Sequence, residues 1–424
     1  MNYPVWQLDF AGGGLLIAII AILHVYIAHF AVGGGLFLVL TELKARRDKS
    51  PVLMEYLRCH TKFFLLLTLI LGGTTGVGIW FTISVLNPAA TSTLIHLFVF
   101  AWGVEWLFFV AEIVSIFIYY YAFDRLTPRH HLMIGWLYFA FAWLSLFVIN
   151  GIVAFMLTPG DWLTTGNFWS ALFNPTFWPA LFFRTFVALI IAGLFGFVTA
   201  TWLKDAETRL SLVRYSAKWV LAPFLLYLAS AWWYRGALPA DLEERIFLLL
   251  PGVTPFIDLF LATSSLLVLG GIIMAIRQPA LLSRSLAALM LVIGLLHLGS
   301  FEFIREGGRK PYIIENHLYS NSLRPDQLAM VMPKGVLQSA RWVEHREITA
   351  TNQLAAGREV YDLLCLSCHS IKGPMKDIQF RTVRLAPGEL ELIISTMGGV
   401  RSYMPPFVGT PEEQQALVAF IKSL

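Results

Sequence analysis

Long apolar stretches, separated by short polar or Pro/Gly-rich loops, fill the chain up to about residue 303. Eight are present, at roughly residues 12–42, 62–86, 94–123, 132–157, 177–203, 213–233, 254–276 and 284–303. Each is long enough to cross the ~30 Å hydrocarbon core of a bilayer as a helix of about 20 residues. The first has no basic segment before it and is too long for a secretory signal, so we expect it to be retained. The pattern predicts a polytopic bundle of eight transmembrane helices.

The pattern changes in the last quarter of the chain, where polar positions become frequent. Residues 315–349 are polar and contain proline, which favours a linker outside the membrane. Residues 353–364 and 411–424 are expected to be the first and last helices of a small domain. We therefore predict an all-α protein with three parts: a transmembrane domain (1–314), a linker (315–349) and a C-terminal domain (350–424).

A five-residue motif indicates the chemistry of the C-terminal domain. Cys365-Leu366-Ser367-Cys368-His369 places two thiols three positions apart, with a histidine directly after them. This is the attachment pattern of a covalent c-type haem, with His369 Nε2 as the proximal iron ligand. A redox pair would not need the histidine, and a zinc site would need a second ligand pair. Residues 350–424 are therefore predicted to be a class I-like cytochrome c domain.

Met404 is the predicted second axial ligand of this haem. It lies 35 positions after His369, in Tyr403-Met404-Pro405-Pro406-Phe407, where two prolines stiffen the loop. A His/Met ligand pair raises the haem potential. Met375 and Met397 are rivals for the same role.

Composition and charge agree with a membrane protein. Hydrophobic residues make up 57% of the chain, charged residues 14%, and the mean hydropathy is +0.67. Covalent haem is attached outside the membrane, so eight spans place both termini on that side. Lys and Arg should concentrate on the cytoplasmic side. The loops expected there hold fourteen of them, whereas the opposite loops between spans hold only Arg235 and Arg245. We predict a bacterial inner-membrane protein whose termini face the periplasm, and the net charge of +4 reflects this topology rather than nucleic-acid binding.

Several ionisable residues fall inside the apolar stretches, where a polar group is costly and is a functional candidate. They are His24, His29, Glu42, His96, Glu105, Glu112, Arg184, Asp258, His297 and Glu302. His60 lies at a span edge, where water can reach it. Hydrogen bonds between helices are the alternative explanation for each of these residues. As a set they suit buried haem ligation and proton transfer, and Glu105 and Glu112 share one face of a helix because they are seven positions apart.

The chain resembles subunit I of the cytochrome bd oxygen reductases over most of residues 8–316. The resemblance rests on the order and spacing of five landmarks. They are His24 with Gly33 and Glu42 at successive intervals of nine, the glycine-rich GGTTGVGIWF around Gly76, Glu112 followed by Asp124-Arg125-Leu126, Asn150-Gly151, and Glu306-Gly307-Gly308-Arg309-Lys310-Pro311-Tyr312.

The resemblance implies roles for individual residues. His24 matches a first-helix histidine that binds an active-site haem. Glu105, with a one-residue slip, and Glu112 match acids that ligate haem and feed protons. Glu306 matches the carboxylate ligand of a high-spin b haem, and Arg309 is the arginine beside it. The implied cofactors are two or three membrane haems of b or d type, in addition to haem c.

Two departures from the family concern electron entry. In the family, a low-spin b haem that oxidises quinol needs a histidine on the fifth span and a methionine on a later one. The fifth-span position falls at or beside Arg184, and residues 258–263 contain no methionine. The quinol-binding loop is reduced to about residues 234–253. The chain therefore resembles the branch with a fused c-type domain, and Arg184 is expected to bind a haem propionate or to stabilise the vacated pocket.

Three further histidines have no counterpart in the quinol-oxidising family. They are His29, His96 and His297, and one or two of them are candidate replacement haem ligands. Interhelical hydrogen bonding is the alternative for each.

The sequence leaves three hypotheses for function. The first is an oxidoreductase, a c-linked terminal oxygen reductase with O2 as substrate. The second is an electron conduit between quinone and periplasmic cytochromes. The third is a non-catalytic haem subunit of a larger respiratory complex. The expected partners are a second membrane subunit and a periplasmic cytochrome or other electron-transfer protein, with no nucleic acid.

Overall fold

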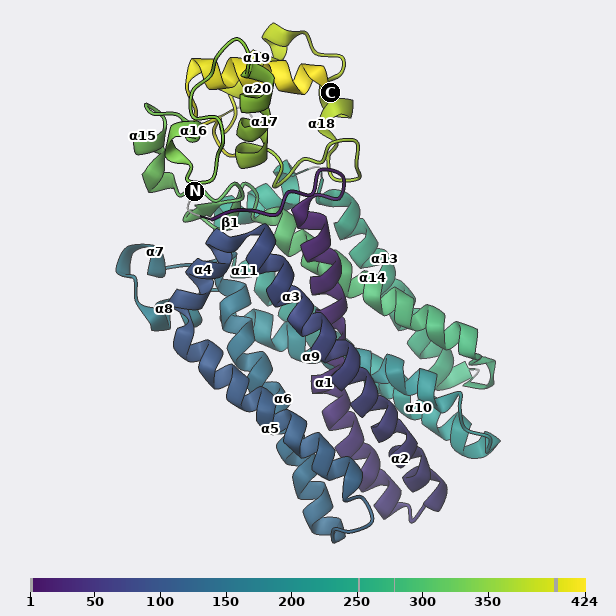
Figure 1. The fold of residues 1–424 in the computed structure, drawn as a ribbon. Helices are drawn as coiled ribbons and strands as arrows, with labels where there is room; N and C mark the ends of the chain where they lie inside the picture. The colour runs from purple at the N-terminus through teal and green to yellow at the C-terminus, as the bar shows by residue number, and fades with distance from the viewer. Residues whose placement is uncertain (1–2, 251, 278, 400–402) are drawn as a thin grey trace. The chain divides into compact units, whose positions relative to one another are not determined.

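The computed structural model describes residues 3–250, 252–277, 279–399 and 403–424. The described chain is mostly helical, with one short two-stranded sheet (Figure 1). It forms two compact units. The larger unit contains Ala21–Val77 and Phe98–Arg305, and the smaller one contains Met1–Ile20, Gly78–Leu97 and Glu306–Leu424.

The region predicted to be transmembrane is a succession of helices. They are α1 (Gly13–Arg47), α2 (Pro51–Leu66), η1 (Leu67–Gly72), α3 (Gly73–Leu86), α4 (Pro88–Leu97), α5 (Val99–Tyr121), α6 (Pro128–Phe155), α7 (Trp162–Thr165), α8 (Phe168–Leu172), α9 (Phe177–Ala200), α10 (Ala206–Leu221), α11 (Phe224–Gly236), α12 (Ala240–Glu244), η2 (Arg245–Leu249), α13 (Thr254–Ile272), η3 (Ile273–Arg277), η4 (Pro279–Leu281) and α14 (Arg284–Gly308). Within the described residues, seven helical segments are long and apolar enough to cross a membrane. They are Gly13–Arg47, Pro51–Leu86, Val99–Tyr121, Pro128–Phe155, Phe177–Ala200, Thr254–Ile276 and Arg284–Gly308.

The sixth expected span, residues 213–233, is not among these seven. It is divided at Pro223 between α10 and α11. Proline has no backbone N–H and its ring crowds the preceding turn, so a helix kinks or ends there. The chain stays locally helical through the break, because the Tyr227 N–H donates to the Pro223 carbonyl at 2.8 Å. The apolar stretch is therefore present as two shorter helices in series.

Side-chain caps mark the starts of several helices. Ser50 Oγ accepts the Leu53 N–H at 3.2 Å at the start of α2. Asp205 Oδ2 accepts the Thr208 N–H at 2.7 Å at the start of α10. These caps satisfy N–H groups that have no partner within the helix, so the loops expected between spans coincide with the observed helix starts.

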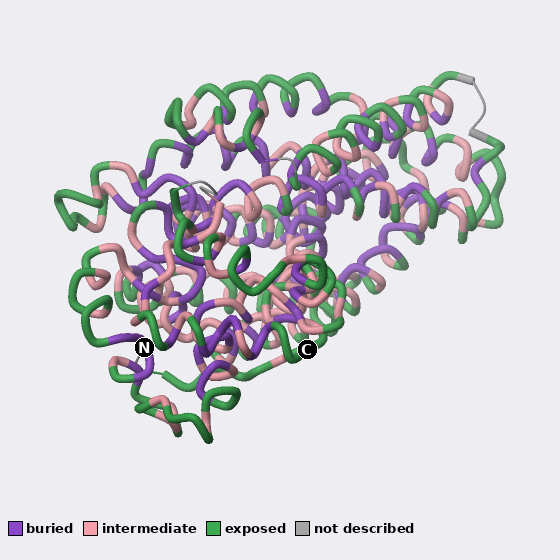
Figure 2. The backbone as a smooth tube through the Cα atoms, turned by 90° about the horizontal axis from the view of Figure 1, so that it is seen from above, coloured by how far each residue is buried: buried purple, intermediate pink, exposed green. Residues whose placement is uncertain are grey.

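The core of the larger unit is built around α9. The most apolar window of α9 is 72% buried, against 11–44% for the other six candidate spans. Gly33 allows α1 to approach α9 closely, since a Cβ at this position would lie 2.0 Å from the Ala188 carbonyl oxygen. Figure 2 shows exposed and buried positions mixed along most helices, as expected for helices that bury one side.

The smaller unit contains the haem motif. Its C-terminal part consists of β1 (Tyr312–Ile314), β2 (Leu318–Tyr319), η5 (Pro325–Gln327), α15 (Leu328–Val331), α16 (Val336–Ser339), α17 (Gln353–Leu364), α18 (Ile378–Thr382), α19 (Pro387–Ser395) and α20 (Pro411–Ser423). The observed α17 and α20 coincide with the two helices expected from the sequence. They pack closely, because a Cβ at Gly357 would lie 2.0 Å from the Ala416 carbonyl oxygen.

The segment expected to be a linker packs into the core of this domain. Leu323, Val336 and Leu337 are buried in one cluster with Val360 of α17. Glu413 on α20 accepts the backbone N–H groups of Val336 at 2.9 Å and Leu337 at 2.8 Å. Residues 315–349 thus include parts of the folded domain, and their polar composition reflects turns and surface rather than a flexible tether.

Candidate haem sites

The covalent haem motif follows the end of α17. The backbone turns there, with the Cys365 N–H bonded to the Tyr361 carbonyl at 2.8 Å and the His369 N–H to the Cys365 carbonyl at 2.9 Å. His369 Nδ1 lies 2.8 Å from the Lys376 carbonyl oxygen, which accepts a hydrogen bond from this nitrogen. Burial lowers the pKa of His369 and keeps the imidazole neutral. This tautomer presents the Nε2 lone pair, which is the form that ligates iron.

The two thiols of the motif differ in acidity. They stand where thioether sulfurs would be once haem is attached. Burial raises the pKa of the Cys365 thiol to about 12. Burial also acts to raise the pKa of the Cys368 thiol, but the charge of Lys310 and a hydrogen bond with Ser320 outweigh this effect, so that pKa is lowered. Cys368 is therefore the more readily ionised nucleophile before attachment.

The geometry around His369 separates the candidate axial methionines. Met375 lies in the loop at residues 370–376 that holds the back of the imidazole, since its carbonyl accepts the Ser370 N–H at 2.7 Å. The Met375 side chain packs against Gly12 and Gly14. Met397 packs against the domain core. Both arrangements favour Met404, which stays a prediction.

Replacing Met404 with alanine is expected to lower the reduction potential of haem c while leaving the haem covalently attached. Loss of a thioether ligand removes the contribution that raises the potential of a His/Met haem, within the ~0.8 V range that axial ligands span. Redox titration of the c-type absorbance measures the effect, and Met375→Ala is the matched control. An unchanged potential in Met404→Ala together with a lowered one in Met375→Ala would contradict the assignment.

His24 on α1 has the geometry of a metal ligand inside the larger unit. Its Nδ1 lies 3.2 Å from both the Gly72 carbonyl oxygen and Thr75 Oγ1. Gly72 ends the π-helical turn η1, and π-turns often occur at functional sites. A Cβ at Gly76 would lie 3.1 Å from His24 Cε1, so this glycine makes room for the ring. A Nδ1–H bonded to a carbonyl orients Nε2 as the ligand atom.

The acids predicted on α5 face α6 in a regular register. Ser145 Oγ donates to Glu105 Oε1 at 2.7 Å, and Tyr138 Oη donates to Glu112 Oε1 at 2.9 Å. The two acids are seven residues apart, and so are their two partners. The antiparallel helices therefore repeat the same pairing two turns apart. Tyr138 and Ser145 are hydroxyl residues seven positions apart on the next apolar stretch, the same spacing as the two acids. This matched spacing could have indicated the partners from the sequence.

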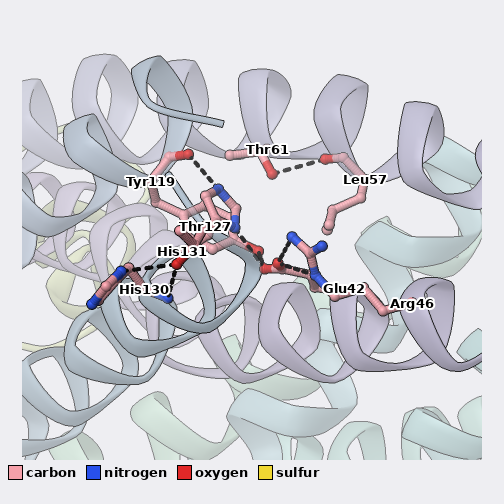
Figure 3. Close-up of polar contacts among 8 residues, drawn as sticks. All are labelled: Glu42, Arg46, Leu57, Thr61, Tyr119, Thr127, His130 and His131. Atoms are coloured by element: carbon pink, nitrogen blue, oxygen red, sulfur yellow. Dashed lines mark hydrogen bonds and ion pairs between the residues drawn. The ribbon is translucent and has the colours of Figure 1, made fainter. Parts of the chain in front are cut away.

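The same register continues to a third pairing of α5 with α6, shown in Figure 3. Tyr119 Oη donates to Glu42 Oε2 at 2.7 Å, and His131 Nδ1 lies 2.8 Å from the same oxygen. Arg46 pairs with the other oxygen, and the Tyr119 carbonyl lies 2.9 Å from His131 Nε2. Glu42 is fully buried and each carboxylate oxygen has a polar partner. Sequence reasoning listed Glu42 without identifying Tyr119 or His131.

Arg184 belongs to a buried charge cluster. Its Nη1 lies 2.8 Å from Glu302 Oε1, and Arg305 Nη2 lies 2.9 Å from Glu302 Oε2. Two guanidinium groups against one carboxylate leave a net positive charge in the bundle. This positive charge would attract a haem propionate, which is the first role expected for Arg184. The ion pair is equally consistent with the second role, in which Arg184 stabilises a vacated pocket.

The three extra histidines have different environments. His29 is buried, its Nδ1 donates to the Val25 carbonyl at 2.7 Å, and its buried Nε2 has no hydrogen-bond partner. His29 therefore keeps a ligand atom available. His297 has Nε2 2.6 Å from Tyr227 Oη and Nδ1 3.0 Å from Thr263 Oγ1. Because both nitrogens are bonded, the geometry of His297 favours interhelical hydrogen bonding over the predicted ligation.

The expectation that His96 lies inside the third transmembrane span is wrong, because the observed candidate span begins at Val99. The helix is interrupted at Phe98, so His96 lies in the last turn of the separate ten-residue helix α4. Its side chain is exposed, and Nδ1 lies 2.7 Å from the Ser92 carbonyl oxygen. The residues on both sides of Phe98 are apolar, so the hydropathy pattern does not reveal the helix break.

His60 is not at a wetted edge, because it is fully buried on α2. Its Nδ1 lies 2.8 Å from Thr199 Oγ1, and its Nε2 is buried without a hydrogen-bond partner. Aromatic rings surround the imidazole, with the Phe37 ring centroid 5.1 Å away. The sequence analysis missed the burial of His60, because lipid-facing and core positions look alike in an apolar stretch.

Glu306 and Arg309 come from the last turn of α14 and the residue after its end. The two side chains form an ion pair, and Arg309 Nη1 also donates to the Ile313 carbonyl at 2.7 Å. Arg309 is buried, whereas the Glu306 side chain is 43% exposed. The arginine thus fixes the direction of a carboxylate that still has an accessible side.

A membrane-embedded helical bundle joined to a domain with an oriented Cys-x-x-Cys-His motif defines a membrane cytochrome. Residues 15–241 match the family model described as cytochrome bd terminal oxidase subunit I, and the chain belongs to that family. Residues 352–421 match the model of cytochrome C oxidase, cbb3-type, subunit III, which implies haem c.

A solved structure supports the fold. The bd oxidase from Geobacillus thermodenitrificans is similar, with a TM-score of 0.62 and 14% sequence identity over 72% of this chain and 89% of that chain. No curated protein matches the chain. The family implies membrane haems, and the chain's residues fit them: His24 and His29 each present Nε2 after bonding Nδ1 to a carbonyl.

Proposed function

We propose that the chain is the haem-bearing subunit of a c-linked oxygen reductase, in which electrons enter through haem c and reach membrane haems of b or d type. The observation that carries this proposal is that one chain contains both an oriented His369 motif and the Arg184–Glu302 ion pair. The c-type motif supplies an electron port. The ion pair occupies the position where the resemblance expects a ligand of the quinol-oxidising haem.

In this mechanism, His24 and Glu306 would each ligate a membrane haem, and His29 is the best placed of the replacement ligands. Arg309 fixes the Glu306 carboxylate, and Arg184 offers a guanidinium to a propionate. The haems supply electron transfer and O2 reduction when bound. The protein contributes ligation, burial and control of protons.

Proton supply is assigned to the acids on α5. Reduction of O2 to water consumes one proton with every electron, and a dry pocket needs a donor chain. Glu112 and Glu105 lie on one face of α5, each bonded to a hydroxyl that can pass a proton. Glu42 stands at the end of the same register. Val39 and Tyr119 pack closely at Gly135, which lies between His131 and Tyr138 on α6, so we propose that proton passage between Glu42 and Glu112 requires a local movement.

We further propose that the cytochrome domain and the N-terminus face the periplasm of a bacterial inner membrane, as the distribution of Lys and Arg indicates. A second membrane subunit fits the poorly buried spans. The most apolar windows of Pro51–Leu86 and Val99–Tyr121 are only 11% and 17% buried within this chain. The electron donor is proposed to be a periplasmic cytochrome or another electron-transfer protein.

The test is a haem inventory with a CO spectrum on the purified membrane protein. We expect one c-type haem and two or three b- or d-type haems per chain by pyridine haemochrome analysis. A high-spin haem should shift its absorbance with CO, and reduced protein should consume O2. One c haem alone would overturn the proposal. Low-spin membrane haems without a CO shift would support a quinone–cytochrome conduit, and inactivity without a copurifying catalytic protein would indicate a non-catalytic haem subunit.

A further inference from the structure

The loop at residues 370–376 positions His369, and the N-terminal segment of the chain holds that loop. Both belong to the smaller unit. The Ile371 N–H donates to the Asp9 carbonyl at 2.7 Å. A Cβ at Gly373 would lie 1.8 Å from the Phe10 carbonyl oxygen, so the two backbones touch at a position where only glycine fits. The loop therefore rests directly on residues 9 and 10.

Two further glycines of the N-terminal segment form a seat for Met375. A Cβ at Gly12 would lie 3.0 Å from Met375 Sδ, and one at Gly14 would lie 3.3 Å from Met375 Cε. Gly12 has φ +70°, a conformation that other residues adopt with strain. Upstream, the Trp6 N–H donates to the Val85 carbonyl at 2.8 Å, which ties the segment to the end of α3.

The other side of the haem motif contacts the turn after α14. Cys368 Sγ lies 3.5 Å from Ser320 Oγ. Ser320 donates to the Pro311 carbonyl from both its hydroxyl and its N–H, each at 2.9 Å. Pro311 lies in the turn that follows α14, and Glu306 lies in the last helical turn of α14. A short chain of contacts thus links the sulfur that will carry haem c to the turn that follows a predicted ligand of a membrane haem.

We propose that haem c is a fixed electron port, clamped between residues 6–14 and the turn after α14, and that it delivers electrons directly to the haem at Glu306. This inference rests on the proposed function for the acceptor haem. A fixed position differs from the expectation that residues 315–349 are a linker, because parts of this segment pack into the cytochrome core. Gly373, Gly12 and Ser320 are positioning residues in this device.

The backbone contacts, rather than charge, hold the clamp. Arg358 Nη2 lies 2.5 Å from Asp9 Oδ1, but the two side chains are 29% and 48% exposed. Exposed ion pairs contribute little to stability. The Ile371 hydrogen bond and the contact at Gly373 involve main chain that cannot move aside without moving the loop. Removing the Asp9 charge is therefore expected to change electron transfer less than twofold.

The experiment compares Gly373→Ala with Gly388→Ala in the full-length protein. A Cβ at Gly388 meets nothing within 4 Å, so this variant controls for a Gly→Ala change in the same domain. Haem c is photoreduced under anaerobic conditions, and the rate of reduction of the membrane haems is followed. Gly373→Ala should slow this step at least about tenfold, since ångström-scale misplacement costs one to two orders of magnitude. Gly388→Ala should match the unmodified protein.

Gly12→Val is the second variant, because it perturbs the seat of Met375 without replacing any residue of the loop at residues 370–376. It should slow the same step while the potential and content of haem c stay unchanged. Equal rates in all variants would overturn the clamp. Hydrogen exchange at the Ile371 amide tests it independently of any acceptor: protection that falls in Gly12→Val supports the clamp, and exchange as fast as in an open loop in the unmodified protein contradicts it. A chain without membrane haems would defeat the proposed function but leave this amide measurement decisive for the clamp.

Discussion

Replacing His24 with alanine is expected to remove a membrane haem and the CO-induced spectral shift, while the c-type haem remains. The imidazole is held through Nδ1 by Gly72 and Thr75, and Gly76 leaves space at Cε1, so the alanine variant loses an oriented Nε2 ligand atom. O2 consumption should fall to background because the reacting site is lost. Pyridine haemochrome analysis and CO difference spectra of the purified variant measure both effects. Added imidazole should restore part of the spectrum by filling the cavity.

His297→Ala is the matched control for this prediction. It removes a buried histidine that is bonded on both nitrogens, so we expect the haem content to persist. Leaving the hydroxyls of Tyr227 and Thr263 without this partner should cost about 1–3 kcal/mol of stability. If His297→Ala loses a haem and His24→Ala keeps all of them, the assignment of the two histidines is reversed.

The features predicted from sequence are those that depend on local pattern. The spans follow from hydropathy alone, and within the described residues seven continuous helical segments are long and apolar enough to cross a membrane. The haem attachment motif is contiguous, so its residues are neighbours in any fold. The sixth expected span is divided at Pro223, whose missing N–H acts locally and could have been weighed from the sequence.

The features that the sequence analysis missed depend on the register between helices. Ser145 and Tyr138 meet Glu105 and Glu112 only because α5 and α6 are antiparallel with one particular offset. The hydroxyl partners of His297 likewise come from two other helices. Residues 315–349 look like a linker in composition, yet Glu413, far along the chain, anchors their backbone.

Replacing Glu112 with glutamine is expected to slow O2 reduction by about 10²–10⁴-fold, the range for loss of a positioned acid or base. The amide preserves shape and still accepts the hydrogen bond from Tyr138, but it cannot take up and release a proton. Haem content and the anaerobic reduction of the membrane haems should stay normal, because electrons do not need this carboxylate. Oxygen consumption and anaerobic stopped-flow reduction, measured on the same sample, separate the two steps.

Glu112→Asp and Tyr138→Phe refine this prediction. Aspartate keeps an ionisable group and should recover part of the rate, which a purely structural role would not require. Phenylalanine keeps the ring that packs against Gly35, where an added Cβ would lie 2.5 Å from Tyr138 Cε1. It removes the hydroxyl, so a smaller slowing of O2 reduction is expected. Glu244→Gln on the exposed end of α12 serves as the control and should leave the rate unchanged. Full activity in Glu112→Gln would remove Glu112 from the proton path. Loss of a haem in that variant would make Glu112 a ligand instead, because a carboxylate that only relays protons is not needed to hold iron.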